Sequence, residues 1–516
     1  MTDINVSRAT DLENPKERAI YRFFEMLPGL LSWGALLSAI ILSFFKPTFV
    51  AIFVIFMAAL LLSRLVYFAF HLRDSYRKMR VSEKTNWLKE LEKLPSDCYS
   101  IPIKNWKEVY HLVILPMYRE PVEVIRDAFA GLVASDYPKE RMIVVLACEE
   151  RAKDEAKKVA ETISTEFKDK FFRFSVIWHP ADLPDEIAGK SSNETWATKQ
   201  VREKVIDPLG IPYENIIISS FDADTVVFPK YFSCLAWNYL TAPKPIQTSF
   251  QPIPLFINNI WKAPAISRVI SFNSTFWHTL NQERPDKLIT FSSHAMSFRA
   301  LVDVGFKDPR WVSDDSHIFW QCFFHYNGDY RVQPLFYPVS MDANVAKSFW
   351  RTIVNIYKQQ RRWAYGVGEI PYFLFGFLKN KQISWKKKFP LGLEVIFGHW
   401  SWATISLLVL FLGWLPLVLG GPAFSRTMLS YNLPRAVSRI FMVANLSLVG
   451  LAWLTILFLP PKPIEYGKSK YVFLILQWVL VPPTMIFFSA FPALDAQTRW
   501  LRGRYMGFWF TEKSRK

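Results

Sequence analysis

The sequence predicts a mixed α/β domain with a parallel, doubly wound sheet, placed between two blocks of membrane-spanning helices. Hydrophobic residues make up 51% of the 516 residues and aromatic residues 16%, yet the mean hydropathy is only +0.10. Long apolar runs lie near both ends of the chain, and the stretch between them has the composition of a soluble domain. A membrane part and a sizeable polar part therefore share one chain.

The composition excludes several other classes of protein. A mainly disordered chain is excluded, because disorder requires low hydrophobicity and 51% of these residues are hydrophobic. Four scattered cysteines without a CxxC pair cannot form a disulfide scaffold, and the eight histidines show no zinc-ligand spacing. The net charge of +17 suggests a polyanionic partner. However, the cations flank apolar runs instead of forming one basic stripe, so no nucleic-acid partner is predicted.

The first membrane block is a predicted helical hairpin over residues 26–72. Residues 26–45 carry no charge and span about 30 Å as a helix, the thickness of a bilayer core. Lys46-Pro47 interrupts the run, and residues 47–72 form a second one. A buried core hairpin is the alternative. A cleaved signal peptide is disfavoured, because acidic residues precede the run and a second span follows at once.

The second block contains three apolar runs, at residues 395–424, 440–461 and 471–494. Lysines and arginines flank the ends of the spans that face the central domain, which predicts a cytosolic domain in a multi-pass protein of the plasma or inner membrane. With three spans in this block, the basic C-terminal tail (497–516) would lie outside the cell, on the side opposite the central domain. The preference of Lys and Arg for the cytosolic side disfavours that arrangement. Either the Pro482-Pro483 segment is a re-entrant hairpin, or residues 389–421 contain an extra membrane element.

Strands and helices alternate in the central domain. Short apolar runs predict strands, and amphipathic stretches predict helices at residues 121–133 and 154–167. The predicted strands are residues 111–117, 141–148, 172–179 and 215–221. Alternation of this kind indicates a parallel sheet, and ligands bind such sheets beyond the carboxyl ends of the strands.

Two polar motifs follow predicted strands. Asp222 and Asp224 come directly after residues 215–221, and paired carboxylates there can hold Mg²⁺ or Mn²⁺ on a diphosphate. Solvated loop acids are the alternative, because an isolated Asp-x-Asp is a weak signal. Lys190 and Asn193 follow Gly189 and can contact a nucleotide, although they can equally open a helix. They do not form a P-loop, because position 184 is Pro.

Two further motifs lie downstream. Asp314 and Asp315 follow Ser313 and can supply a general base, although an N-cap for a helix over residues 317–324 explains them equally well. Gln359, Arg362 and Trp363 lie within residues 348–378, for which we expect an amphipathic helix at the membrane surface. Arginines there can also simply attract lipid headgroups.

Together, these motifs resemble those of the membrane-embedded family 2 glycosyltransferases with a GT-A catalytic domain, the group containing cellulose, hyaluronan and cyclic-glucan synthases. The resemblance runs from about residue 110 to residue 363. Pro116, Tyr118 and Glu120 resemble the opening PxYNE, with Arg119 in place of Asn; Gly189, Lys190 and Asn193 resemble GK..N; Asp222 and Asp224 match DxD; Gln247 and Thr248 resemble QTP without its Pro; Asp314 and Asp315 occupy the place of TED; and Gln359, Arg362 and Trp363 match QxxRW.

The resemblance implies a GT-A (Rossmann-like) fold and a role for each matching residue. Asp222 and Asp224 would hold Mg²⁺ or Mn²⁺, and Asp315, beside Asp314, would be the catalytic base. The nucleotide would contact Tyr118, Glu120, Lys190 and Asn193; the diphosphate or the acceptor would contact Gln359, Arg362, Trp363 and His294. His294 lies where related enzymes line the acceptor site, and a core histidine is the alternative reading.

One position departs from the family pattern. The second strand of these enzymes normally ends in an Asp that binds the nucleobase, and here Glu149 and Glu150 follow Cys148. Glu149 is the expected substitute. A UDP-sugar, the donor of the best-known members, is the expected substrate.

The expected function is therefore inverting transfer of a sugar from a cytosolic nucleotide-sugar to a growing polysaccharide. A lipid-linked acceptor is the alternative, and a non-enzymatic protein that binds anionic lipid or nucleic acid is the alternative from another class. Membrane lipids are expected partners, and an oligomer or accessory secretion subunits are possible ones. The expected regions are a cytosolic segment (1–25), a membrane hairpin (26–72), the GT-A domain (73–347), an interface helix region (348–388), a membrane block (389–496) and a basic tail (497–516).

Overall fold

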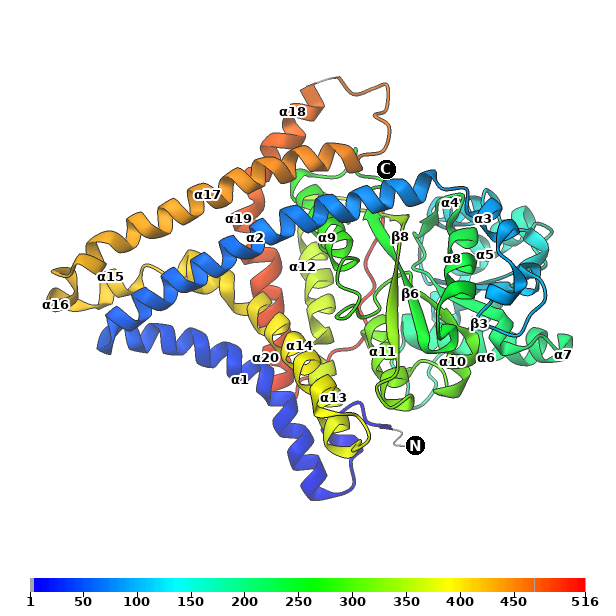
Figure 1. The fold of residues 1–516 in the computed structure, drawn as a ribbon, viewed down its shortest axis with the longest axis horizontal. Coiled ribbons are helices and arrows are strands. Elements are labelled where there is room, and N and C mark those ends of the chain that lie inside the picture. The colour runs from blue at the N-terminus through cyan, green and yellow to red at the C-terminus, as the bar shows by residue number, and fades with distance from the viewer. Residues whose placement is uncertain (1–3, 468, 516) are drawn as a thin grey trace.

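The computed structural model of the chain describes residues 4–467 and 469–515, so the predictions for residues 1–3 and 516 fall outside the described part. A sheet domain lies at one end of the molecule, and long helices extend from it toward the other end (Figure 1). The strands are β1 (Tyr110–Met117), β2 (Met142–Glu149), β3 (Arg173–His179), β4 (Ile216–Ser220), β5 (Val226–Val227), β6 (Thr248–Phe256), β7 (Ala295–Ser297) and β8 (Arg331–Met341).

The predicted α/β fold class is confirmed, and all four predicted strands are present. The eight strands form one sheet in the order β3-β2-β1-β4-β7-β6-β8-β5. β3, β2, β1 and β4 run parallel. The expectation of a wholly parallel sheet was wrong for the other half, because β7 is antiparallel to both β4 and β6, and β5 is antiparallel to β8.

β1 shows why the parallel half forms. Its apolar run is buried on both faces, as expected of a central strand covered by helices on each side. Leu112 and Ile114 belong to one hydrophobic core, and Val113 and Leu115 belong to the other. The helices that pack on these two cores are α3 (Trp87–Lys93), α4 (Val122–Val133), α5 (Lys153–Phe167) and α8 (Tyr231–Thr241) on one face, and α6 (Lys190–Val201), α10 (Phe298–Asp303), α11 (Asp314–His325) and α13 (Glu369–Lys379) on the other.

Four helices in the described part of the chain are long and apolar enough to cross a membrane. They are Pro15–Phe45, Pro47–Lys84, Trp385–Phe411 and Ser469–Leu501. They correspond to α1, to α2, to α14 (Trp385–Ser406) with its continuation, and to the segment of α18 (Ser469–Leu476), α19 (Val481–Met485) and α20 (Phe491–Leu501). Between them lie α15 (Leu415–Leu419), α16 (Gly421–Ser425) and α17 (Met428–Phe458), whose Val449–Phe458 part is also apolar.

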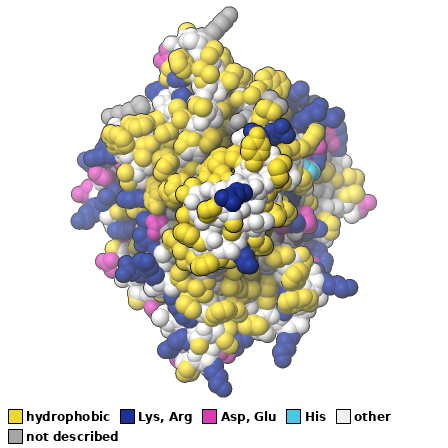
Figure 2. All heavy atoms as spheres, turned by 90° about the vertical axis from the view of Figure 1, so that its left-hand side faces the viewer, with side chains coloured by type: hydrophobic (Ala, Val, Ile, Leu, Met, Phe, Trp, Pro, Cys, Tyr) yellow, Lys and Arg dark blue, Asp and Glu magenta, His cyan; other side chains and the backbone are white. Residues whose placement is uncertain are grey.

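The end of the molecule opposite the sheet is covered by hydrophobic side chains. Figure 2 shows this face, where most Lys, Arg, Asp and Glu side chains gather around the rim. Exposed Phe45, Phe49 and Val418 contribute to the apolar surface of these helices. Such a surface requires an apolar surrounding, as a lipid bilayer provides.

α2 connects this end of the molecule to the sheet domain as one uninterrupted helix. It packs along α17, and its C-terminal part reaches α9 (Ala265–Asn281) and β8. Leu72 and Met79 are buried in the core that these elements share, and Ser75 Oγ donates to Thr279 O over 2.6 Å. The helix is therefore fixed to the sheet domain by both apolar packing and hydrogen bonds.

The segment that follows α20 returns to the sheet. Residues 502–515 run between α12 (Phe349–Ala364) and the sheet (Figure 1), and Arg515 pairs with Asp342 at the end of β8. This segment and the sheet therefore lie on the same side of any membrane that the helices cross. Four candidate spans, selected by length and composition, are compatible with that placement; the side of the membrane on which the basic tail lies stays a prediction.

The stretch predicted as one amphipathic helix, residues 348–378, is divided in two. α12 and α13 are joined by a short 3₁₀-helical segment at Tyr365–Gly368, where a Cβ atom on Gly368 would lie 2.3 Å from Trp500. Polar Asn355 and Gln360 of α12 face the protein, whereas Trp350 and Val354 are exposed. Apolar side chains of α12 thus point outward and polar ones point toward the protein. This is the pattern expected of a helix whose outer face touches a membrane surface.

Candidate active site

Carboxylates collect at the carboxyl ends of the parallel strands. Glu120 follows β1, Glu149 ends β2, and Asp222 and Asp224 follow β4. Glu120, Glu149 and Asp224 are buried, although charged side chains are seldom buried without a partner. The carboxylates at this edge of the sheet therefore need neighbouring cations or hydrogen-bond donors to compensate their burial.

Tyr118 marks the part of the site nearest β1 and β2. The guanidinium groups of Arg151 and Arg119 lie 4.3 and 4.9 Å from the centre of its ring, and Arg151 also pairs with Glu149. Glu120 Oε2 accepts a hydrogen bond of 2.7 Å from the Tyr118 backbone N–H. Glu149 is thus already neutralised by a neighbouring arginine, and Glu120 holds the loop after β1.

Lys190, the first residue of α6, joins the two acidic motifs. Its Nζ lies 2.6 Å from Asp222 Oδ1 and 2.8 Å from Asp315 Oδ2. The position follows from the local fold, because α6 begins beside the end of β2, where Asn193 Nδ2 donates to Ala147 O over 2.8 Å. Asn193 therefore fixes the helix to the strand, and its buried side chain is not turned toward open space.

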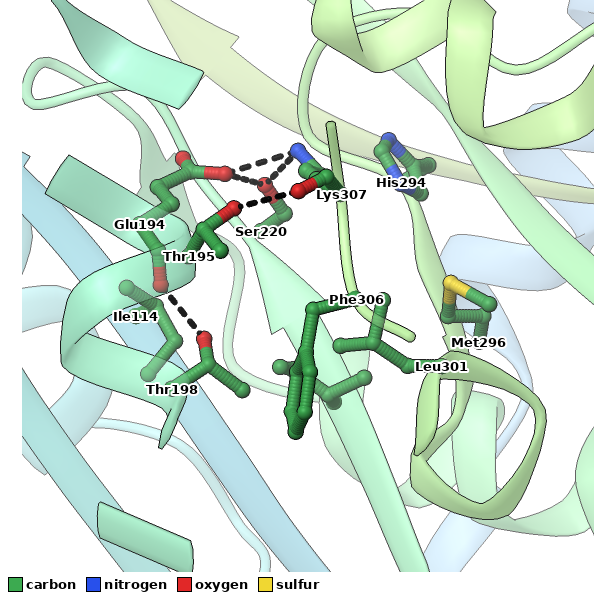
Figure 3. A pocket seen from close by; sticks show the side chains of 11 residues that line it. Ile114, Glu194, Thr195, Thr198, Ser220, His294, Met296, Leu301, Phe306 and Lys307 are labelled. Atoms are coloured by element: carbon green, nitrogen blue, oxygen red, sulfur yellow. Dashed lines mark hydrogen bonds and ion pairs between the residues drawn. The ribbon is translucent and has the colours of Figure 1, made fainter. Parts of the chain in front are cut away.

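A second ammonium group, that of Lys307, lies on the other side of Asp315. Its Nζ lies 2.7 Å from Glu194 Oε2, 2.8 Å from Asp314 Oδ2 and 3.3 Å from Asp315 Oδ1, and it also donates to Ser220 Oγ over 2.8 Å. Figure 3 shows the Lys307, Glu194 and Ser220 side chains meeting at the edge of a small cavity. Asp314 and Asp315 are thus brought together with Asp222 through two lysines.

The two lysines determine the charge states of these acids. Burial alone would raise the pKa of Asp315, but Lys190 and Lys307 hold it well below its ordinary value. Burial would lower the pKa of Lys190, yet Asp222 and Asp315 raise it well above its usual range. Burial raises the pKa of Glu194 to about 7 despite the Lys307 charge. Asp315 is therefore ionised, and Glu194 holds a proton far more readily than Asp315 does.

Asp224 faces a third cation, which comes from the far end of the chain. Lys513 Nζ lies 2.5 Å from Asp224 Oδ1, while Asp224 Oδ2 accepts the Asp342 backbone N–H over 3.0 Å. Arg515 pairs with Asp342. The carboxylates of Asp224 and Asp342 therefore lie side by side with their charges balanced by residues of the 502–515 segment.

Aromatic residues of the same segment cover the site. The Phe510 ring lies 5.3 Å from that of Tyr118, edge to face, and the Arg362 guanidinium lies 4.8 Å from the Phe508 ring. Gly189 is required by this packing, because a Cβ atom there would lie 2.5 Å from Phe508. The 502–515 segment thus occupies the space between Tyr118, Lys190 and α12.

α12 supplies the remaining predicted residues. Gln359, Arg362 and Trp363 lie on one face at i, i+3 and i+4. Gln359 Oε1 accepts from Asn344 Nδ2 over 3.0 Å, and Gln359 and Trp363 line a second small pocket with Asp342 and Phe256. The neighbouring Arg361 has a different place, since it pairs with Asp495 of α20 over 2.8 Å.

His294 lies beside the acid cluster but is buried. Its Nδ1 lies 3.7 Å from Asp315 Oδ1 and 3.1 Å from Phe291 O, while Nε2 has no hydrogen-bond partner among the described residues. Burial, followed by the Lys307 charge, lowers the pKa of His294 to about 3. A neutral imidazole therefore packs under the acids.

Two groups of acids could hold a divalent metal. Asp222, Asp224 and Asp342 offer hard oxygen donors suited to Mg²⁺ or Mn²⁺, and each of them is paired with a cation, Lys190, Lys513 and Arg515 respectively. Glu194, Asp314 and Asp315 offer ligand atoms within 4.8 Å of one another, but the Lys307 ammonium group already lies among them. Both groups therefore offer suitable oxygen donors, and in both a cation of the protein would have to give way to the metal.

Sequence reasoning missed four residues of this site. Asp342 directly follows a strand, so an acid at a strand end was the available signal, but β8 itself was not predicted. Lys307 and Glu194 carry no recognisable spacing. Lys513 belongs to the basic tail, which sequence reasoning treated only as a topology marker.

Comparisons with known proteins give only distant similarity. No family model and no curated protein matches the chain. Among solved structures, a mannosyltransferase from Pyrobaculum calidifontis in complex with GDP-Man and Mn²⁺ is 14% identical, with 78% of this chain and 99% of that chain covered at a TM-score of 0.43. S. aureus TarS 1-349 with UDP-GlcNAc is 12% identical, with 77% and 93% covered and a TM-score of 0.36. GalNAc-T7 with UDP, GalNAc and Mn²⁺ is 10% identical, with 57% and 58% covered and a TM-score of 0.32.

Proposed function

We propose that this protein is a membrane-embedded, inverting glycosyltransferase of the family 2, GT-A type that transfers a sugar from a nucleotide-sugar, expected to be a UDP-sugar, to a growing polysaccharide. One observation carries the proposal. Lys190 contacts both Asp222 and Asp315, so a carboxylate suited to a metal and a carboxylate suited to a base lie on either side of one ammonium group. The proposed transfer of a sugar from a diphosphate to a hydroxyl uses both kinds of carboxylate, one for the metal at the diphosphate and one for the proton of the hydroxyl.

The donor would bind at the strand ends. Asp222, Asp224 and Asp342 would hold Mg²⁺ or Mn²⁺, which supplies positive charge to the departing diphosphate. Tyr118 offers a ring beside the nucleobase, and Glu149 follows β2 where the base would lie. Arg362 of α12 faces the same cluster and would stabilise the leaving diphosphate.

The acceptor would be activated by Asp315. Its carboxylate takes the proton of an acceptor hydroxyl as the oxygen attacks the anomeric carbon. The new carbon–oxygen bond forms as the bond to the diphosphate breaks, and the electron pair leaves with the nucleoside diphosphate. A single displacement inverts the anomeric configuration. Trp363 lies beside a pocket lined by Phe256 and Gln359, where an aromatic ring can stack on the acceptor sugar.

The 502–515 segment would have to move for this reaction to take place. Lys513 occupies the cation position at Asp224, and Phe508 lies against Gly189. The metal and the diphosphate would replace the ammonium group. We therefore regard the described arrangement as a closed form of the site.

The cellular setting follows from the helices. The apolar ends seen in Figure 2 would lie in the plasma or inner membrane, with the sheet domain in the cytosol beside the nucleotide-sugar pool. The exposed Trp350 and Val354 of α12 would lie near the membrane surface. Trp363, on the same helix, would then lie close to the spans through which a polymer would leave.

The test uses purified protein and a panel of nucleotide sugars, with nucleotide release scored with and without Mg²⁺ or Mn²⁺. Release with one sugar nucleotide supports the proposal, whereas no release with any of them contradicts it. Product size then separates a polymer from single transfer to a lipid-linked acceptor.

The Asp315→Asn variant tests the proposed base. It should lower kcat by about 100-fold or more and leave donor binding intact, because Asp315 does not contact the donor end of the site. Isothermal titration with the nucleotide diphosphate measures binding independently of turnover. Near wild-type turnover in this variant would show that the base is another residue.

A further inference from the structure

Lys307 is the most completely enclosed cation in the cluster. Its Nζ has four oxygen neighbours, from Glu194, Ser220, Asp314 and Asp315, between 2.7 and 3.3 Å away, and the residue is only 6% exposed. A buried charge in the described site is held this way only when neighbouring groups compensate its desolvation.

Two separate elements, α6 and β4, hold Lys307 in place. Glu194 of α6 and Ser220 of β4 contact its Nζ, and Thr195 Oγ1 of α6 donates to its backbone carbonyl over 2.9 Å, as drawn in Figure 3. The preceding residue, Phe306, has a φ of 73°. Such a conformation is costly for a bulky side chain and persists where the surrounding structure imposes it.

The two lysines on Asp315 differ in their other contacts. Lys190 also contacts Asp222, a residue of the proposed donor site, so a bound diphosphate would attract its ammonium group. Lys307 faces away from that site, toward α6 and β4. Lys190 contacts both oxygens of Asp315, Oδ1 over 3.1 Å and Oδ2 over 2.8 Å. Lys307 contacts Oδ1, so Oδ2 loses its ammonium contact when Lys190 moves away.

We propose that Lys307 is a positioning residue that holds Asp315 by Oδ1, so that Oδ2 is the oxygen that takes the proton from the acceptor when Lys190 turns to the donor. The inference rests on the proposed function. The acceptor proton passes to Oδ2, the acceptor oxygen bonds to the anomeric carbon, and the electron pair of the broken bond leaves with the nucleoside diphosphate. Glu194 lies 2.7 Å from Lys307 Nζ and 3.8 Å from Lys190 Nζ, so it acts on Asp315 through the lysines and mainly through Lys307.

The charged and titratable groups around Asp315 are few. Asp314 lies on its own helix, Lys190 and Glu194 come from α6, and Arg362 comes from α12. Asp222 follows β4 and shares Lys190 with Asp315, and His294 and Lys307 come from loops. Removing Lys307 takes away one of the two ammonium groups in contact with the base. The base then titrates at higher pH and loses its fixed orientation.

The test compares Lys307→Met with the wild type and with Lys204→Met, which removes an exposed lysine of the 202–206 turn. For Lys307→Met we expect a fall in kcat of about 30-fold or more, a donor KM within about threefold of wild type, and an acidic limb of the pH–kcat profile moved to higher pH. Lys307→Arg keeps the cation and should retain more of kcat than Lys307→Met. Lys204→Met should match the wild type.

Unchanged kcat and an unmoved acidic limb in folded Lys307→Met would overturn the inference while the wild type remained active. Loss of kcat together with loss of donor binding, with the limb unmoved, would also overturn it, because a purely structural role predicts that result. If Lys307→Met does not fold, Glu194→Gln decides: a partial fall in kcat at constant donor affinity supports the inference, and wild-type kcat overturns it. An inactive wild type would overturn the proposed function, and this inference with it.

Discussion

Glu369, the first residue of α13, provides a test of how the site is supported. Its carboxylate is buried and accepts hydrogen bonds from Ser316 Oγ and from Trp320 Nε1, the latter over 3.0 Å. Both donors belong to α11, whose first residues are Asp314 and Asp315. Burial raises the pKa of Glu369 from its ordinary value of 4.5 to about 7, against the effect of these two hydrogen bonds.

The direction of the pH effect follows from the proton balance. Between pH 4.5 and about 7 the folded protein holds a proton on Glu369 that the unfolded chain has released, so the stability falls as the pH rises. The contribution is fully present below pH 4.5 and is lost above about 7. The shift of about 2.5 units, at about 1.4 kcal/mol each, corresponds to roughly 3 kcal/mol.

The Glu369→Gln variant removes the titration and keeps the shape of the side chain. Its melting temperature, followed by tryptophan fluorescence in detergent, should equal that of the wild type at pH 5 and exceed it by a few degrees at pH 8. Glu155→Gln, at an exposed position of α5, is the matched control and should show no such difference. A Glu369→Gln protein less stable than the wild type at pH 8, or a difference independent of pH, would refute the reasoning.

Two further predictions concern the 502–515 segment and the 3₁₀-helical segment between α12 and α13. Lys513→Ala should tighten Mn²⁺ binding in the absence of donor by about tenfold, or about 1.4 kcal/mol, because the ammonium group no longer competes for Asp224; calorimetry that finds weaker binding would show that Lys513 is not a competitor. Gly368→Ala should lower the stability by about 1–3 kcal/mol, because its Cβ would lie 2.3 Å from Trp500. Gly507→Ala, where a Cβ meets nothing within 4 Å, is its control in the same thermal unfolding assay.

The sequence was sufficient to predict the parallel half of the sheet. β1, β2 and β4 are continuous apolar runs, and each is followed by polar residues at its carboxyl end. β6 and β8 were not predicted, because each contains two prolines. These are Pro252 and Pro254 in β6, and Pro334 and Pro338 in β8. A proline lacks the N–H that a strand in a sheet donates, so it argues against a central strand.

The residues of the candidate site also fall into two groups, those that a local sequence pattern predicts and those that it does not. Asp222, Asp224, Asp314 and Asp315 were predicted because each pair is a short pattern within the sequence. Lys307 carries no such pattern, and Lys513 is nearly three hundred residues from Asp224 along the chain. Only the return of the 502–515 segment to the sheet brings that lysine to the acid, and local patterning contains no information about such a contact.

α2 also defines how far the chemistry lies from the lipid. Its 38 residues extend about 57 Å as a helix, and a bilayer core accounts for about 30 Å of that length. The remaining part, about 27 Å, is the portion held by Thr279 and the surrounding core. If the protein is embedded in a membrane as proposed, this helix would fix the distance between the sheet and the bilayer, and a polymer or lipid-linked acceptor would reach the site at that one distance.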